Sequence, residues 1–251
     1  MGIFNKLMAN IGIGSASVDT IIENSKICAG DEIRGYINIK GGKIPQKFED
    51  IYIYVMTKVE KENNNVKYIG KEKVQKIVIP VSKTISSTDD IKIPFNFILS
   101  KQTPITTLKT PVWIHTGLDI KSAIDPKDND SLQISPHPYF QLVLNAIERL
   151  ELIIYRAVNV EDFYYSSYPF LQEIEFRPTG SLKYELENLK LLYVLYDDHL
   201  ELIMEVNKLH DEISLKDMKT RLSISYNDLK NKDPFDIAMT IKKSMFKQNV
   251  K

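Results

Sequence analysis

The amino-acid sequence predicts a mostly β chain built from two β-sandwiches in tandem, with short helices near its N- and C-terminal ends. Apolar and polar residues alternate in about a dozen short segments separated by polar turns, which is typical of sandwiches and not of βαβ units. Helical spacing of apolar residues occurs in only a few segments. The 251 residues, of which 43% are hydrophobic, suffice for two sandwich cores.

In the first half, the spacing of apolar residues over 3–11 predicts a short amphipathic helix. Alternation then predicts strands at 18–22, 33–39, 51–59, 66–79, 91–99 and 112–120. The polar residues 61–65 indicate a turn that makes a long hairpin, and Pro80 is expected to end its second strand. Pro94 marks an edge or bulged strand, because proline donates no ladder hydrogen bond.

In the second half, residues 122–138 are rich in Asp, Pro, Asn and Ser and are interpreted as the connection between the domains. We therefore expect an N-terminal sandwich over 1–135, a second sandwich over 136–228 that opens with a helix at 139–150, and an amphipathic helix within 229–251. Strands are expected at 151–157, 170–176, 188–196, 199–206 and 219–226. Asp197-Asp198 reads as a tight turn, and Asp233 as the cap of a helix that begins at Pro234.

Composition narrows the function classes. Thirty-three basic residues balance 33 acidic ones, whereas a nucleic-acid-binding protein is usually basic, so we expect no nucleic-acid partner. A single cysteine excludes an internal disulfide framework. The first residues lack a basic region followed by an apolar run, so a cytoplasmic location is expected.

The candidates for chemistry are weak. Asp125, Asp128 and Asp130 group three carboxylates that could bind a hard cation, but they lack the EF-hand spacing, and a solvated linker is the favoured interpretation. Neither the four histidines nor Cys28 forms a recognisable metal or nucleophile motif. We therefore predict no catalytic site, no metal site and no cofactor.

Two surface segments stand out. The hairpin 58–76 carries six lysines against three glutamates, and we interpret it as a solvated strand edge guarded by lysines. The second segment, 161–170, is rich in aromatic residues, which favours either a protein interface or packing of the loop on its own sheet. Both readings remain open. The candidate partner-binding residues are Phe163, Tyr164, Tyr165 and Tyr168.

Four motifs in the same order resemble the bacterial sporulation-control protein M family, which belongs to the arrestin-like fold. The motifs are Gly12-Ile13-Gly14 with Val18-Asp19-Thr20, Ala29-Gly30-Asp31-Glu32 through Gly41-Gly42, Thr116-Gly117-Leu118-Asp119 with Asp125-Pro126, and Phe170-Leu171-Gln172-Glu173 through Arg177-Pro178. A departure is Ala29, where the family often has proline.

The resemblance implies two tandem arrestin-like sandwiches without catalytic residues. It also implies a cytoplasmic, non-enzymatic regulatory adaptor that acts at the onset of sporulation through protein–protein interaction. The expected partners are other cytoplasmic proteins, and a homodimer remains an alternative. A peripheral membrane or cation-responsive binding module, using the terminal helices and the 125–130 segment, is the alternative function.

Overall fold

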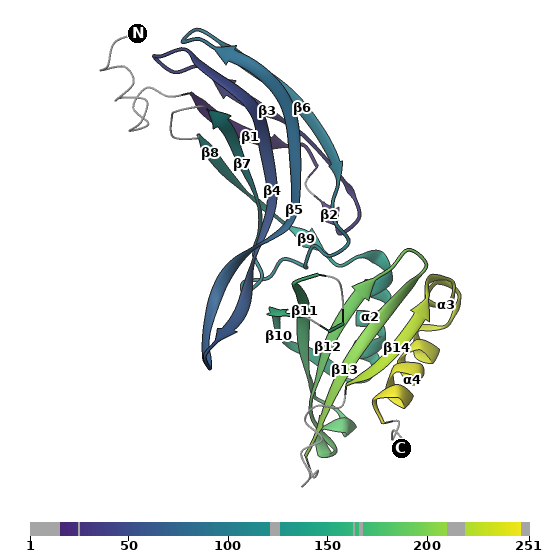
Figure 1. Ribbon diagram of the computed structural model, residues 1–251. Helices are drawn as coiled ribbons and strands as arrows, with labels where there is room; N and C mark the ends of the chain where they lie inside the picture. Colours follow the sequence, from purple (N-terminus) through teal and green to yellow (C-terminus); the bar gives the residue numbers. More distant parts are fainter. Residues whose placement is uncertain are drawn as a thin grey trace. The chain divides into compact units, whose positions relative to one another are not determined.

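The computed structural model describes residues 16–24, 26–120, 126–162, 164–165, 168–209 and 219–246. The expected helix at 3–11 and the candidates Asp125 and Phe163 lie outside these residues. The fold is mostly β with few helices, as predicted (Figure 1). The chain divides into two compact units, which are described separately. No helix in the described part combines the length and apolarity needed to cross a membrane.

Unit 1 comprises 1–57, 71–106 and 111–135 and has two layers of antiparallel strands. One sheet has the order β1 (Ser17–Ile22), β3 (Glu32–Lys40), β6 (Asp90–Ile98). The other joins β4 (Gln46–Asn63), β5 (Val66–Ile85), β7 (Val112–Ile120) and β8 (Lys127–Leu132). A short parallel pair forms between β2 (Ile27–Cys28) and β9 (Ile134–Ser135).

The core of unit 1 is a single buried cluster that draws on both sheets. Ile33 and Ile37 of β3 belong to it together with Ile51 and Ile53 of β4, and all four are fully buried. This is the alternation that the sequence predicts, because successive side chains of a strand point to opposite faces. Pro94 lies on β6, an edge strand of its sheet, which confirms that prediction.

The long hairpin is confirmed, but the expectation for Pro80 is wrong. β4 and β5 are joined by Asn64 and Asn65, which adopt positive φ angles of 48° and 63° as a two-residue hairpin turn requires. β5 then continues through Pro80 to Ile85. Among the described strands, β5 pairs with β4 alone, so one of its edges is unpaired. Proline is tolerated at such an edge, and Pro80 is exposed.

The interpretation of 122–138 as a connection is wrong for part of its length. Residues 127–132 form β8, which pairs antiparallel with β7 over six residue pairs from Val112↔Leu132 to Gly117↔Lys127. Hydropathy hides this strand because its inward-facing positions include Asp128, whose carboxylate is held by a hydrogen bond from the Thr20 amide at 2.7 Å. A polar contact replaces the apolar alternation that marks the other strands.

Unit 2 comprises 136–251 together with the segments 58–70 and 107–110. A domain boundary at residue 135, as expected from the sequence, places these two segments in the N-terminal domain. Its sheet has the order β14-β13-β12-β11-β10, with antiparallel pairing throughout. The strands are β10 (Leu152–Glu161), β11 (Phe170–Pro178), β12 (Leu186–Leu195), β13 (His199–Lys208) and β14 (Thr220–Ser225). The helices are α2 (Pro138–Arg149), α3 (Tyr226–Asn231) and α4 (Pro234–Met245), with a 3-10 turn at Ser181–Tyr184.

Helices pack on one face of the sheet in unit 2. α2 packs against β10, and α4 packs against α2, β13 and β14. The rings of Phe140 on α2 and Tyr193 on β12 stack with centroids 3.8 Å apart. Among the described residues, helices cover the face of this sheet on which Tyr193 lies. The assignment of 136–228 to a second arrestin-like sandwich stays a prediction.

The predicted start of the last helix at Pro234 is confirmed, and α2 begins at Pro138, one residue before the predicted start. Pro138 and Pro234 each occupy the first helical turn, where the missing amide hydrogen costs nothing. The Asp233 carboxylate accepts a hydrogen bond from the Phe235 amide at 2.7 Å, as expected of a cap. The tight turn at Asp197-Asp198 is confirmed by the hydrogen bond from the Tyr196 amide to the His199 carbonyl at 3.0 Å.

Candidate functional site

The aromatic loop between β10 and β11 is fixed at its base by Asp162. The Asp162 amide donates to the Pro169 carbonyl at 3.1 Å, which closes the loop. The buried Asp162 carboxylate accepts hydrogen bonds from the amides of Tyr164 and Tyr165 at 3.1–3.2 Å. An aspartate that bonds the next backbone amides stabilises a turn without regular secondary structure. Asp162 therefore fixes the base of the described part of this loop.

The described rings of this loop have different environments. Tyr164 is 85% exposed and Tyr168 is 37% exposed. Tyr165 packs against a buried cluster of Leu171, Leu192, Val194 and Ile203 on the sheet. Lys219 and Arg221 lie over its ring at 4.9 and 5.1 Å from the centroid. Within this loop Tyr165 packs on its own sheet, whereas Tyr164 is exposed to solvent.

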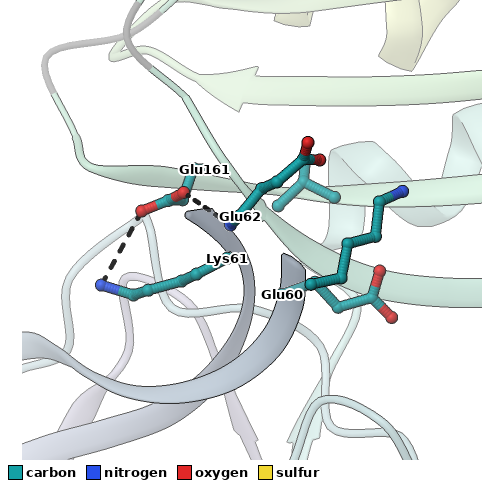
Figure 2. A pocket seen from close by; sticks show the side chains of 6 residues that line it. Glu60, Lys61, Glu62 and Glu161 are labelled. Atoms are coloured by element: carbon teal, nitrogen blue, oxygen red, sulfur yellow. Dashed lines mark hydrogen bonds and ion pairs between the residues drawn. The ribbon is translucent and has the colours of Figure 1, made fainter. Parts of the chain in front are cut away.

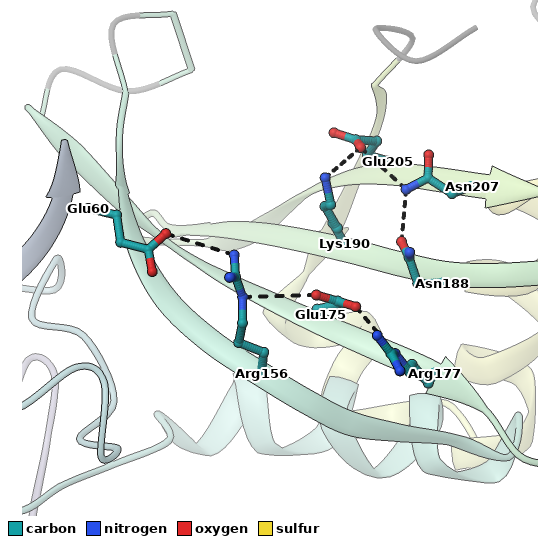
Figure 3. A network of polar contacts seen from close by, with 8 residues as sticks. All are labelled: Glu60, Arg156, Glu175, Arg177, Asn188, Lys190, Glu205 and Asn207. Carbon is teal, nitrogen blue, oxygen red and sulfur yellow. Dashed lines mark hydrogen bonds and ion pairs between the residues drawn. The ribbon is translucent and has the colours of Figure 1, made fainter. Parts of the chain in front are cut away.

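A row of alternating charge crosses the sheet face next to this loop (Figure 3). Arg156, Glu175, Lys190 and Glu205 stand directly opposite one another on β10, β11, β12 and β13. Arg156 Nε lies 3.9 Å from Glu175 Oε2, and Lys190 Nζ donates to Glu205 Oε1 at 2.9 Å. We call these four residues the charge row. It lies on the face opposite α2, because α2 packs on Tyr193, and Lys190 points the other way.

Burial and neighbouring charge set the protonation of the groups around the charge row. Burial raises the pKa of Glu173, and this outweighs the opposing positive charge of Lys190. Burial acts to lower the pKa of Lys190, but the hydrogen bond to Glu205 and the nearby carboxylates reverse this and raise it. The lysine therefore stays charged within the row.

The charge row was not anticipated from the sequence, although a signal for it exists. The turn at Asp197-Asp198 places Leu195 opposite Leu200, and counting back along both strands places Lys190 opposite Glu205. Opposite charges in directly opposed positions stabilise strand pairs. The pairing of Glu175 with both Arg156 and Lys190 depends on two further hairpins and is harder to infer.

A small cavity lies where the tip of the β4–β5 hairpin meets β10 within unit 2 (Figure 2). Its volume is about 210 Å3, and it is lined by Glu60, Lys61, Glu62, Lys67, Val160 and Glu161. Lys61 Nζ lies 3.9 Å from Glu161 Oε1, and the Glu62 amide donates to Glu161 Oε2 at 3.3 Å. Lys61 and Glu161 therefore compensate each other's charge within the wall.

The hairpin tip is joined to β10 by backbone and buried side-chain contacts. Glu60 and Val160 form a parallel bridge, and the buried Asn159 side chain donates to the Lys58 carbonyl at 2.8 Å. Arg156 Nη2 also lies 3.9 Å from Glu60 Oε2 (Figure 3). These contacts place the tip in unit 2, although it belongs to the N-terminal half of the sequence.

Of the weak cation candidates, Asp128 and Asp130 lie in strand β8. The Asp128 carboxylate accepts hydrogen bonds from the amides of Thr20 and Asn129, at 2.7 and 2.9 Å. Burial, followed by the neighbouring Asp128 and Asp19, raises the pKa of Asp130 to about 7. Within the described ranges, no group of three histidine, cysteine or acidic side chains is arranged to hold a metal ion.

Comparison with known proteins gives consistent similarities. The family described as "SpoOM protein" matches residues 4–210. The sporulation-control protein Spo0M of Bacillus subtilis (strain 168) is 36% identical over 213 residues, which cover 83% of this chain and 81% of that protein. The crystal structure of Spo0M from Bacillus subtilis matches with a TM-score of 0.84 at 30% identity, and the match covers 93% of this chain and 98% of that one.

Proposed function

Because this chain belongs to the Spo0M family of sporulation-control proteins, we propose that it is a non-enzymatic regulatory adaptor that acts at the onset of sporulation by binding other proteins of the cytoplasm. The observation that carries the proposal is the exposed Tyr164 in a loop whose base is held by Asp162. A tyrosine presented in this way offers contact area with little loss of side-chain entropy on binding.

The environment of the loop supports this use. Tyr165 anchors the loop on the sheet through the apolar cluster and the two cations over its ring. Tyr164 and Tyr168 remain exposed to different degrees. Interfaces commonly have a core enriched in aromatic residues and arginine, surrounded by a polar rim. We therefore propose Tyr164 as the contact residue, with Tyr168 beside it, and Tyr165 as a residue that supports the loop.

We also propose that unit 1 is an arrestin-like sandwich. Its two layers of antiparallel strands around one core support this assignment. The arrestin-like fold resemblance favours protein binding, because sandwiches of this type present loops and sheet faces as contact surfaces. Fold kinship alone does not establish function, so the proposal depends on the loop.

The test is affinity capture with the purified full chain from extracts of its native cells entering sporulation, quantified by mass spectrometry. Tyr164→Ala is expected to reduce recovery of specific partners at least about fivefold, as loss of an interface aromatic residue commonly does. Tyr184→Ala is the matched control, because Tyr184 is also in unit 2 and is 70% exposed. It should leave recovery unchanged.

Two outcomes would count against the proposal. If the wild-type chain captures no protein above the level of an unrelated bait, the adaptor function is wrong. If partners are captured equally by wild type and by a folded Tyr164→Ala variant, the adaptor function stands but the loop is not its site. Tyr165→Ala is avoided as a probe, because removing a packed ring would also weaken the sheet.

A further inference from the structure

The outer face of one sheet in unit 1 gathers lysine and aromatic side chains from distant parts of the sequence. Ile51, Ile53 and Val55 of β4 point into the core, so Tyr52 and Tyr54 point outward. His115 of β7 stands directly opposite Tyr54, and Trp113 stands opposite Met56. We call the following set the lysine–aromatic face: Tyr52, Tyr54, Lys71, Lys73, Lys76 and Trp113.

The three lysines of β5 fold over these rings. Lys73 Nζ lies 4.9 Å from the centroid of Tyr54, and Lys76 Nζ lies 5.6 Å from Tyr52 and 5.8 Å from Tyr54. Lys71 Nζ lies 6.0 Å from the Trp113 ring. A lysine that only guards a strand edge extends into water. Here the ammonium groups are placed in a row by cation–π contacts.

Among the described residues, the three lysines of this face take part in no salt bridge, in contrast to the charge row of unit 2. Gly117 of β7 is paired with the outward-facing Tyr52 on one side and with Lys127 of β8 on the other. Lys127 therefore adds a further positive charge to the same face. Asp119 of β7 is an acidic residue on this face, and it lies near the end of the strand that is far from Trp113.

We propose that the lysine–aromatic face binds an extended acidic segment of a partner protein. This inference rests on the proposed adaptor function only in that the ligand belongs to another protein; the surface is separate from the loop at Tyr164. In an extended chain, alternate side chains are about 6.6–6.8 Å apart. Lys71 and Lys73 are alternate residues of the extended strand β5. Their backbone positions therefore repeat with the same period as carboxylates at alternate positions of an extended peptide.

Single-stranded nucleic acid fits the face less well. Proteins that bind single-stranded nucleic acids stack the bases on the exposed faces of aromatic rings. The Tyr54 ring already has Lys73 and Lys76 over it and His115 stacked against it at an interplanar angle of 24°. Arginine, the side chain best shaped for phosphate, is absent from the set. The geometry favours single carboxylates paired with single ammonium groups.

The test measures binding of a fluorescein-labelled peptide of alternating glutamate and serine residues to the full chain by fluorescence anisotropy. The triple variant Lys71→Gln/Lys73→Gln/Lys76→Gln is expected to weaken binding at least about tenfold, through the loss of three ion pairs. Tyr54→Leu, which leaves the charge unchanged, is expected to weaken it about threefold by releasing the lysines from their positions. Wild-type binding should weaken as salt is added.

The matched control is Lys26→Gln/Lys40→Gln/Lys43→Gln, which removes the same charge from exposed lysines elsewhere in unit 1. It should change affinity by less than about twofold. An oligothymidylate and phosphatidylserine vesicles are measured in parallel. The inference is overturned if wild type does not bind the peptide, if both triple variants lose affinity equally, or if the oligonucleotide or vesicles bind this face more tightly than the peptide. None of these results bears on partner capture through Tyr164, so the two proposals fail separately.

Discussion

Asp130 has an unfavourable environment for its charge at neutral pH. Burial is the main cause, the neighbouring Asp128 and Asp19 add to it, and the pKa is raised to about 7. One carboxylate oxygen, Oδ2, is buried with no hydrogen-bond partner among the described residues. In the unfolded chain an aspartate has a pKa of about 3.9. Between these two values the folded protein holds a proton that the unfolded chain has released.

The pH dependence follows from this difference. The free energy of unfolding falls as pH rises from about 4 to about 7, and the full penalty remains at higher pH. Asp130→Asn is therefore expected to raise the free energy of unfolding by about 1 kcal/mol at pH 8, a value discounted for solvent screening. At pH 5 it should bring little gain. Urea denaturation followed by the fluorescence of Trp113, on the neighbouring β7, measures both values.

Asp128 supplies the contrast at the same scale. Its carboxylate accepts hydrogen bonds from the Thr20 and Asn129 amides, so Asp128→Ala should destabilise unit 1. The loss should be smaller at pH 8 than at pH 5, because the variant also removes a negative charge that raises the pKa of Asp130. An Asp130→Asn variant whose gain is the same at both pH values would show that the carboxyl group does not titrate in the expected range.

At the scale of elements, the turn of the β4–β5 hairpin can be tested through its backbone. Asn65 has φ = 63°, a left-handed conformation that glycine adopts freely and alanine does not. Asn65→Gly is expected to keep or raise stability, because Asn-Gly is the favoured pair for this turn. Asn65→Ala should lower the free energy of unfolding by about 1 kcal/mol. Equilibrium urea denaturation compares the two.

Asn63 provides the control for this pair, because it is exposed and lies in β4 immediately before the turn. Asn63→Ala should change stability by no more than about 0.5 kcal/mol. If the alanine and glycine variants at position 65 are equally stable, the hairpin does not depend on a left-handed conformation there.

At the scale of the whole molecule, unit 2 is not a contiguous stretch of sequence. Segments 58–70 and 107–110 belong to it. They supply the Lys58 carbonyl to buried Asn159, and the Thr110 hydroxyl to buried Gln172 at 3.1 Å. A fragment of residues 136–251 loses these contacts, and buried polar groups that lose partners cost about 1–3 kcal/mol each.

We expect this fragment to unfold several degrees below unit 2 of the full chain. Helical circular dichroism follows unit 2 in both proteins, because the described α-helices all belong to it. Trp113 fluorescence follows unit 1 in the full chain alone. A fragment that melts at the same temperature as unit 2 of the full chain would show that the two added segments contribute no stability.

Much of the fold could be predicted because its determinants are local. The period of two identified most strands, and turn chemistry identified the hairpins at Asn64-Asn65 and Asp197-Asp198. β8 was missed because a carboxylate held by a backbone amide replaces its apolar alternation. Within the candidate site, the sequence indicated the aromatic segment but not which ring packs on the sheet. The packing of Tyr165 depends on a cluster of residues from three strands, β11, β12 and β13.

The sequence by itself determined a mostly β chain with few helices, the last of them started by Pro234, and with paired hairpins. It could do so because periodicity, capping and turn geometry act over a few residues. Only the tertiary structure decided that 58–70 belongs to unit 2, that Tyr164 is exposed while Tyr165 is packed, and that Lys73 lies over Tyr54. Each of these depends on pairing and burial between segments far apart in the chain, and no local pattern encodes such contacts.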